Sequence, residues 1–128
     1  MSVLRGIIRS TLYVRVQPNR FLVRHIESAR EASADSSQPF TTQRLLIGEF
    51  LLAEATLRRA MAQVRYGNAF LAAPTIVIHP LVMTEGGLAP VEHRVLMEVA
   101  DCAGAKRVTV WVGHDLTDNE VREKARAA

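Results

Sequence analysis

Two short apolar runs with a helical segment between them most constrain what this chain can fold into. Residues 75–79 are rich in β-branched side chains, which is typical of a buried strand. Pro80 ends this run, and Pro90 suits the first turn of a helix, because the N–H that it lacks would have no helical partner there. Gly104 ends the helix, and a second apolar run follows at residues 108–112. We therefore predict a βαβ unit with parallel strands and a right-handed connection.

Apolar spacing predicts three helices outside the N-terminal segment. The helix at residues 90–103 is expected to bury Val91, Val95, Leu96, Val99 and Cys102. A helix from residue 50 to about 66 is expected to line one face with Leu51, Leu57, Met61 and Val64 and to stop at Gly67 and Asn68. The polar C-terminal segment predicts a last short helix, with Thr117 or Asp118 as its N-cap.

The N-terminal half contains alternating β-forming segments. Residues 11–16 and 21–26 alternate on either side of a Gln-Pro-Asn turn signal, which predicts a β-hairpin. Residues 27–38 are Ser, Ala and charged residues without apolar periodicity, so a flexible connection is expected from 27 to about 40. The apolar run at residues 45–47 predicts a third strand. The fold class is therefore α/β: a mixed sheet with an N-terminal hairpin followed by βαβα elements.

Length and composition limit the protein to a small number of classes. The 128 residues are 48% hydrophobic and 23% charged, which suits one domain, spanning residues 11–128, and excludes a disordered chain. The lone Cys102 excludes a disulfide framework and a thiolate zinc cluster, and it favours a reducing compartment. The sequence contains no apolar run of the roughly 20 residues that a spanning helix needs. We expect a cytoplasmic protein.

Basic residues are concentrated at the N-terminal end. Residues 1–30 contain six arginines and a single acid, Glu27, whereas the remaining 98 residues carry ten basic and twelve acidic side chains. This asymmetry favours an anionic partner, with the solvated side of an edge hairpin as the alternative. Nucleic acid is not expected, because little aromatic interleaving accompanies the arginines. Residues 1–10 read as a short amphipathic leader, whose candidate contacts with a membrane surface are Leu4, Arg5, Ile7, Ile8 and Arg9.

Several segments, taken in order, resemble the bacterial actin homologue MreB. The strand that ends in Pro80 is followed by Val-Glu-His-Arg at residues 91–94, where that family has V-E-R-R. An Ala-Gly-Ala turn follows at residues 103–105. Upstream, residues 46–50 are similar to the family's V-I-A-D-F segment, and residues 3–8 to its membrane-binding leader. The resemblance implies a ribonuclease-H-like, actin-like half-fold that covers subdomain IA alone.

The departures from that family bear on function. The resemblance places residues 15–19 on a D-x-G-T-x-N loop that cradles ATP phosphates. Here Arg15, Gln17 and Pro18 replace the Asp, Gly and Thr, and Asn19 closes the loop. This degenerate loop lacks a carboxylate for Mg²⁺, which takes oxygen ligands. The family's catalytic acid falls on Gly113, and the adjacent His114 is a weaker candidate for a base.

The remaining histidines and the cysteine favour structural roles. The four histidines lack the spacing of a metal site, and His79, at the end of a buried strand, is expected to be a satisfied core or rim residue. Cys102 falls on the apolar stripe of its helix and is expected to be buried. We therefore expect no catalytic residue, no metal and no cofactor.

These observations favour a non-catalytic protein that resembles MreB and acts through protein contacts in the bacterial cytoskeleton or cell-shape system. The expected partner is an MreB-type filament or a second copy of the chain. Candidate contact residues on the outward face of the helix at 90–103 are His93, Arg94 and Glu98. The alternative is a small ATP-binding or metal-dependent enzyme domain on a ribonuclease-H-like sheet, which would need carboxylates at the strand ends.

Overall fold

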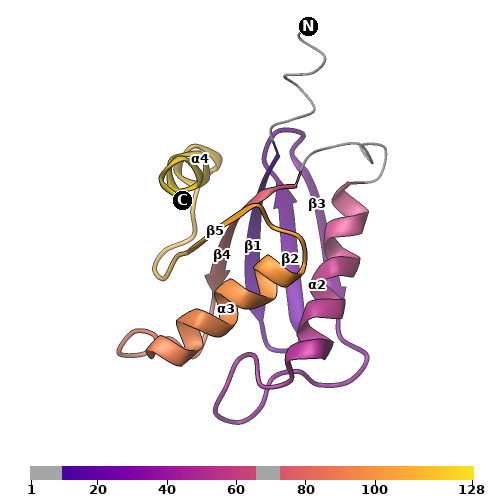
Figure 1. The fold of residues 1–128 in the computed structure, drawn as a ribbon, viewed down its shortest axis with the longest axis vertical. Helices are drawn as coiled ribbons and strands as arrows, with labels where there is room; N and C mark the ends of the chain where they lie inside the picture. The colour runs from indigo at the N-terminus through magenta and orange to yellow at the C-terminus, as the bar shows by residue number, and fades with distance from the viewer. Residues whose placement is uncertain (1–9, 66–72) are drawn as a thin grey trace, which may run out of the picture.

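A five-stranded mixed sheet organises the chain in the computed structural model, which describes residues 10–65 and 73–128. The strands are β1 (Thr11–Gln17), β2 (Arg20–His25), β3 (Arg30–Asp35), β4 (Thr75–Pro80) and β5 (Arg107–Val110). The described helices are α2 (Phe50–Val64), α3 (Pro90–Cys102) and α4 (Asp118–Ala127). The strand order is β3-β2-β1-β4-β5 (Figure 1). Strands β1, β2 and β3 are antiparallel neighbours, whereas β4 and β5 run parallel to β1.

The predicted hairpin and βαβ unit are both confirmed. Two residues, Pro18 and Asn19, connect β1 to β2, and Asn19 adopts a φ of 60° that its short polar side chain tolerates. Strand β4, helix α3 and parallel strand β5 form the βαβ unit. Gly104, with a φ of 115°, follows α3 and turns the chain toward β5.

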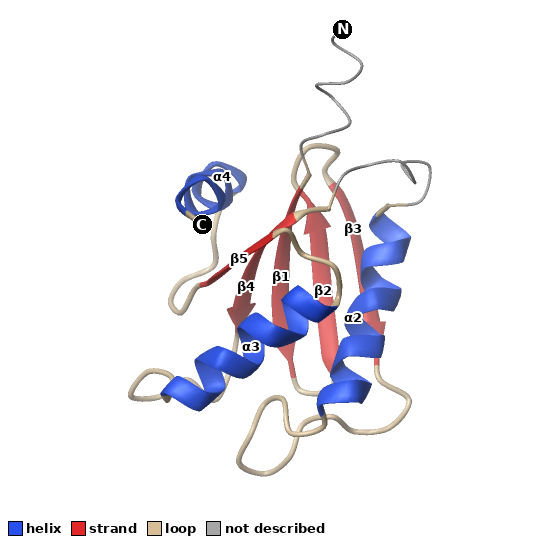
Figure 2. Ribbon diagram, viewed as in Figure 1, coloured by secondary structure: helices blue, strands red, loops and turns tan. Residues whose placement is uncertain are grey.

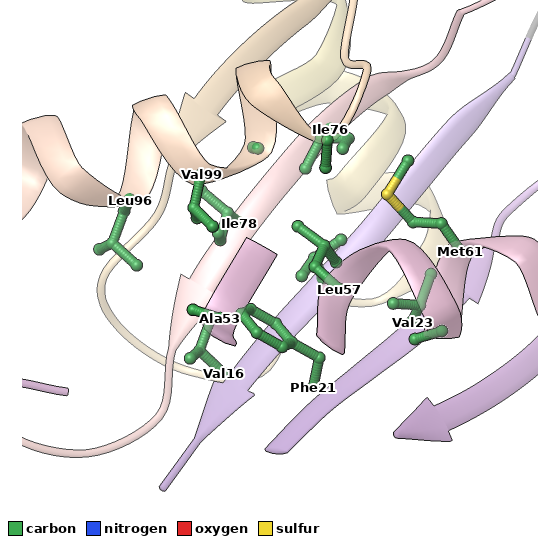
Figure 3. Close-up of a cluster of buried hydrophobic side chains, with 14 of the residues drawn as sticks. Val16, Phe21, Val23, Ala53, Leu57, Met61, Ile76, Ile78, Leu96 and Val99 are labelled. Carbon is green, nitrogen blue, oxygen red and sulfur yellow. The ribbon is translucent and has the colours of Figure 1, made fainter. Parts of the chain in front are cut away.

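Helices α2 and α3 cover one face of the sheet, and α4 packs on the other (Figure 2). The larger core lies under α2 and α3. Figure 3 shows Leu57 and Met61 of α2 and Leu96 and Val99 of α3 gathered around strand residues that include Ile78. The smaller core joins alternate strand residues to α4; its members are Tyr13, Ile26, Val77, Leu116 and Val121. The larger core thus spans the sheet, whereas the backbone of α4 packs against β1, β4 and β5.

The prediction of a flexible connection is wrong for residues 30–35, which form the edge strand β3. Ala34 of this strand is buried, while Glu31 and Asp35 point outward and are exposed. The alternation is present, but its apolar members are small alanines without β-branched side chains. Residues 30–35 therefore form a strand because their backbone pairs with β2, and their side-chain pattern alone does not indicate it.

The strand predicted at residues 45–47 is also wrong. These residues belong to the loop between β3 and α2, in which Leu46 and Ile47 are buried and Leu45 is 41% exposed. The loop is held by its own turn, in which Thr42 N–H donates to the Leu45 carbonyl at 2.8 Å. An apolar run therefore covers the end of the core without joining the sheet.

Three residues predicted to be buried on helices are exposed. On α2, Leu51 is 77% exposed, and on α3, Val91 is 63% exposed and Cys102 is exposed. Leu51 lies on the side of α2 opposite its buried residues, and Val91 and Cys102 lie off the buried stripe of α3, so these side chains face away from the sheet. The buried residues of α3 are Leu96, Val99 and Ala100.

Other predictions have simpler outcomes. Thr117 is the N-cap of α4, with its hydroxyl accepting the Glu120 N–H at 3.2 Å. Strand β5 ends at Val110, two residues earlier than predicted. Residues 1–9 of the predicted leader, and the helix stop predicted at Gly67 and Asn68, lie outside the described residues.

Candidate functional site

The parallel strands β1, β4 and β5 end at one edge of the sheet, which we name the carboxyl edge. Arg15 of β1 lies in register with His79 of β4. The His79 Nε2 donates to the Gly113 carbonyl at 2.9 Å. Arg15, His79 and Gly113, which were predicted to lie at strand ends, therefore come together here. Ligands of open α/β sheets bind at such an edge.

His79 is a satisfied buried residue, as predicted. It is 1% exposed, and its Nδ1 lies 2.7 Å from the Tyr13 hydroxyl. Because the Gly113 carbonyl can only accept, Nε2 carries the proton and Nδ1 accepts from Tyr13. The Tyr13 hydroxyl in turn accepts the Leu116 N–H at 3.2 Å. Burial lowers the pKa of His79 and raises the pKa of Tyr13, so both side chains are neutral at pH 7.

Arg15 is the cation of this edge. Its guanidinium carbon lies 5.3 Å from the centroid of the Tyr13 ring. Its Nε is buried and has no hydrogen-bond partner among the described residues. Within residues 10–65 and 73–128, no group of three His, Cys, Asp or Glu side chains is placed to hold a metal ion. The edge therefore has a guanidinium beside a buried, neutral imidazole.

The turn at Pro18 and Asn19, which the resemblance predicted to be part of a degenerate phosphate loop, is hydrogen-bonded to another segment of the chain. The Asn19 N–H donates to the Thr41 hydroxyl at 2.9 Å, and the Thr41 N–H donates to the Asn19 side-chain oxygen at 2.8 Å. The Asn19 carbonyl accepts the Ser36 N–H at 2.9 Å. Pro18 has no N–H to offer. The backbone groups of this turn are thus engaged by the loop between β3 and α2.

An apolar groove lies on the other side of the carboxyl edge, between that loop and the first turns of α3. Its empty volume is about 490 Å³, open solvent included, and its walls include Leu45, Ile47, Val82, Met83, Val91 and Val95. Leu45, Val82 and Val91 are 41%, 39% and 63% exposed. Sequence reasoning missed the groove because it assigned residues 45–47 to a strand and Val91 to the core.

The arginines of the hairpin are largely paired within the protein. The Arg24 guanidinium donates to both carboxylate oxygens of Asp118 at 2.9 Å and to Glu31 at 2.8 Å. These hydrogen bonds raise the pKa of Arg24. Those that reach Asp118 also lower the pKa of that carboxyl group. Arg20 lies 3.7 Å from Asp35. The basic N-terminal end predicted from the sequence is therefore partly neutralised by acids of β3 and α4.

Comparison with known proteins places the chain in a family. The uncharacterized protein YjaA of Escherichia coli strain K12 is 43% identical over 101 residues, which cover 75% of this chain and 76% of the relative. The chain belongs to the YjaA family. No protein-family profile matches it.

The three predicted contact residues lie on α3 of this YjaA-family chain. His93, Arg94 and Glu98 are exposed, and Arg94 Nε donates to Glu98 at 3.1 Å. Arg94 and Glu98 line a shallow depression beside Lys106, whereas Glu92 lines the apolar groove. The structure therefore brings none of the three into the groove.

The candidate membrane contacts of this YjaA-family chain, at residues 4, 5 and 7–9, lie outside the described residues. Within the part of the chain that is described, no helix is both long and apolar enough to span a bilayer.

Proposed function

We propose that this protein is a non-catalytic, actin-like protein related to MreB, which works in the cytoplasm through contacts with an MreB-type filament. Its role is structural or regulatory in the cytoskeletal or cell-shape system. Weak membrane contact through residues 4–9 belongs to the same proposal. Membership of the YjaA family is compatible with this role.

The order of elements supports the actin-like half-fold. An N-terminal hairpin is followed by a third strand, a helix, a βαβ unit and a last helix. Strand β1 is the central strand, with the antiparallel β2 on one side and the parallel β4 on the other. The resemblance implied a hairpin followed by βαβα elements, and β3 adds an edge strand in place of the expected connection.

The observation that carries the proposal is the apolar groove. Leu45, Val82 and Val91 expose apolar side chains around one concave surface, and a contiguous patch of this kind marks a site of interaction. Leu51, at the start of α2, is a further exposed apolar side chain of the described region. A polypeptide segment with apolar side chains would remove these groups from water.

The proposed loss of nucleotide chemistry is supported by the polar side of the carboxyl edge. The Asn19 N–H already donates to Thr41, and Pro18 supplies no donor. Arg15 and His79 stand where metal-dependent chemistry on such a sheet would need carboxylates. A protein with these groups is better suited to binding a partner than to hydrolysing ATP.

Cosedimentation with polymerised MreB-type protein tests the proposal. We expect the wild-type chain to pellet with filaments and Val91→Glu to bind at least tenfold more weakly, because a carboxylate in the apolar groove stays hydrated. Val112→Glu is the matched control, since Val112 is 38% exposed and does not line the groove. Binding that is absent, or equally weakened in both variants, would exclude the groove as the docking site.

A nucleotide-binding enzyme is the second candidate. It is favoured by the buried Nε of Arg15, which has no hydrogen-bond partner in the part of the chain that the structure describes. A guanidinium at a carboxyl edge can hold a phosphate group. Titration with ATP and Mg²⁺, followed by amide chemical shifts, separates the two functions. The non-catalytic proposal expects no saturable response at residues 15–19. A saturable response centred there, with ATP turnover, would make the enzyme the better description.

A further inference from the structure

A second cleft lies at the opposite end of the sheet, where β1, β4 and β5 begin; we name it the basic cleft. It lies between these strand ends and the C-terminal half of α4, and its empty volume is about 990 Å³, open solvent included. Its walls include Glu27, Thr75, Lys106, Arg107, Arg122 and Arg126. In Figure 1 the strands β1 and β4 begin at the upper end of the sheet, which is also where α4 stands.

The sheet register explains how the strand side of the cleft forms. Thr11 lies in register with Thr75, and Thr75 with Arg107. Successive side chains of a strand point to opposite faces, so these residues share the face of Tyr13 and Val77, which α4 covers. Arg107 therefore points to the side of the sheet on which α4 lies.

Helix α4 supplies the other side. Arg122 and Arg126 are four residues apart and so lie on one face of the helix. Like charges at this spacing destabilise an isolated helix. Across the cleft, the positive charges of Lys106 and Arg107 also repel those of Arg122 and Arg126. Four cations thus line one cleft: Lys106 and Arg107 at the start of β5, and Arg122 and Arg126 on α4.

These cations have few partners within the described residues. Lys106, Arg107 and Arg126 form no ion pair with a described carboxylate, and Arg122 donates to the Asn119 side-chain oxygen at 3.0 Å. Glu27, the one acid among the described residues that line the cleft, accepts the Thr11 N–H at 2.8 Å. The cleft therefore holds a surplus of positive charge, with guanidinium groups that match phosphate oxygens in pairs.

We propose that the basic cleft binds a phosphate group that carries at least two negative charges, either on a free phosphorylated compound or on a lipid headgroup. Arg107 and Arg126 are the principal ligands, because one belongs to the sheet and the other to α4. The site is independent of the proposed function, since it lies at the end of the sheet opposite Arg15 and the apolar groove.

Titration with inorganic pyrophosphate tests the site. We expect saturable amide shifts at residues 106–107 and 122–126, with an affinity that falls as NaCl rises from 50 to 200 mM because salt screens the charges. The double variant Arg107→Gln/Arg126→Gln should bind at least tenfold more weakly. Arg44→Gln is the control, because Arg44 is an exposed arginine that does not line the cleft. Thermal melting checks that each variant is folded.

Two results would overturn the proposal: no saturable shift at the cleft, or the same affinity in the double variant as in the control. Shifts confined to residues 15–19 would also overturn it, and they would bear on the nucleotide-binding alternative. Because the cleft and the carboxyl-edge turn have separate amide signals, failure of one proposal is distinguishable from failure of the other.

Flotation with vesicles separates the two sources of the phosphate. Vesicles of phosphatidylcholine with 20% phosphatidic acid are compared with pure phosphatidylcholine, using the complete chain. Residues 1–9 are the same in the wild type and the double variant, so a difference between these proteins reports the cleft. If the wild type binds the phosphatidic acid vesicles and the double variant does not, the phosphate group belongs to a lipid headgroup. Pyrophosphate binding without such vesicle binding assigns a free phosphorylated compound.

Discussion

His79 connects two segments through two polar contacts beside the smaller apolar core. It accepts from Tyr13 of β1 and donates to the carbonyl of Gly113, beyond the end of β5. Both contacts require the neutral ring with its proton on Nε2. Because the ring is buried, protonation would remove the acceptor that Tyr13 uses and would place a charge in a site with little water.

This arrangement predicts that stability falls as the pH drops below about 6.5. Burial lowers the pKa of His79, and that of His25, below the unfolded value of about 6.5, so the unfolded chain takes up protons that the folded chain does not. The stabilisation is complete above that value and is lost as the pH falls. Urea unfolding of His79→Gln should show a smaller loss between pH 7 and 5 than the wild type.

His93→Gln is the matched control, because His93 is exposed on α3. It should keep the full pH dependence of the wild type. If His79→Gln kept that dependence too, the buried imidazole would not be its source.

Among the elements, α4 depends on side-chain contacts to keep its place. Its only fully buried apolar residue is Val121, and Asp118, in its first turn, accepts two hydrogen bonds from Arg24 of β2. A carboxylate in the first turn also interacts favourably with the helix dipole. Arg24 therefore joins the N-terminal end of α4 to the antiparallel half of the sheet, which the helix does not cover.

We predict that Arg24→Met lowers the free energy of unfolding by about 1–2 kcal/mol, the magnitude of a partly buried, hydrogen-bonded charge pair. Arg94→Met, which removes the exposed pair with Glu98, should cost no more than about 0.5 kcal/mol. Denaturant unfolding measures both. A double-mutant cycle between Arg24→Met and Asp118→Asn should give a clear coupling energy, and a coupling of zero would contradict the proposed link.

At the scale of the molecule, the two faces of the sheet are covered unequally. Neighbouring residues of β4, Val77 and Ile78, are both completely buried, one under α4 and the other in the larger core. On β2, Val23 is 1% exposed, whereas Leu22 is only half-buried. The second face is therefore closed over the parallel strands and more open over the antiparallel ones.

This difference predicts the cost of two truncations on the same face. Val77→Ala should lower the free energy of unfolding by about 2 kcal/mol, since it leaves a cavity in a closed cluster. Leu22→Ala removes more atoms but should cost about 1 kcal/mol or less, because water reaches the site already. Urea denaturation measures both, and a larger loss for Leu22→Ala would mean that the antiparallel half of this face is covered.

Local sequence patterns were enough to predict the hairpin, the βαβ unit and an N-cap at Thr117 or Asp118, because turn residues, β-branched runs and capping side chains act within a few positions. They also predicted that His79 would be a satisfied residue, since a polar side chain at the end of a buried strand must find partners. The partners themselves, Tyr13 and Gly113, are 66 and 34 residues away and could not be read from spacing.

Tertiary structure alone decided the rest. Strand β3 exists because β2 offers it a hydrogen-bonding edge. Val91 and Leu51 are exposed because they lie away from the buried side of their helices. The positions of the charges also depend on the tertiary structure. Arg20 and Arg24 of the hairpin form ion pairs with acids that are distant in the sequence. Arg107 and Arg126, 19 positions apart, line one cleft. Pairing, burial and charge neutralisation depend on which segments meet in space, and that depends on the packing of the whole chain.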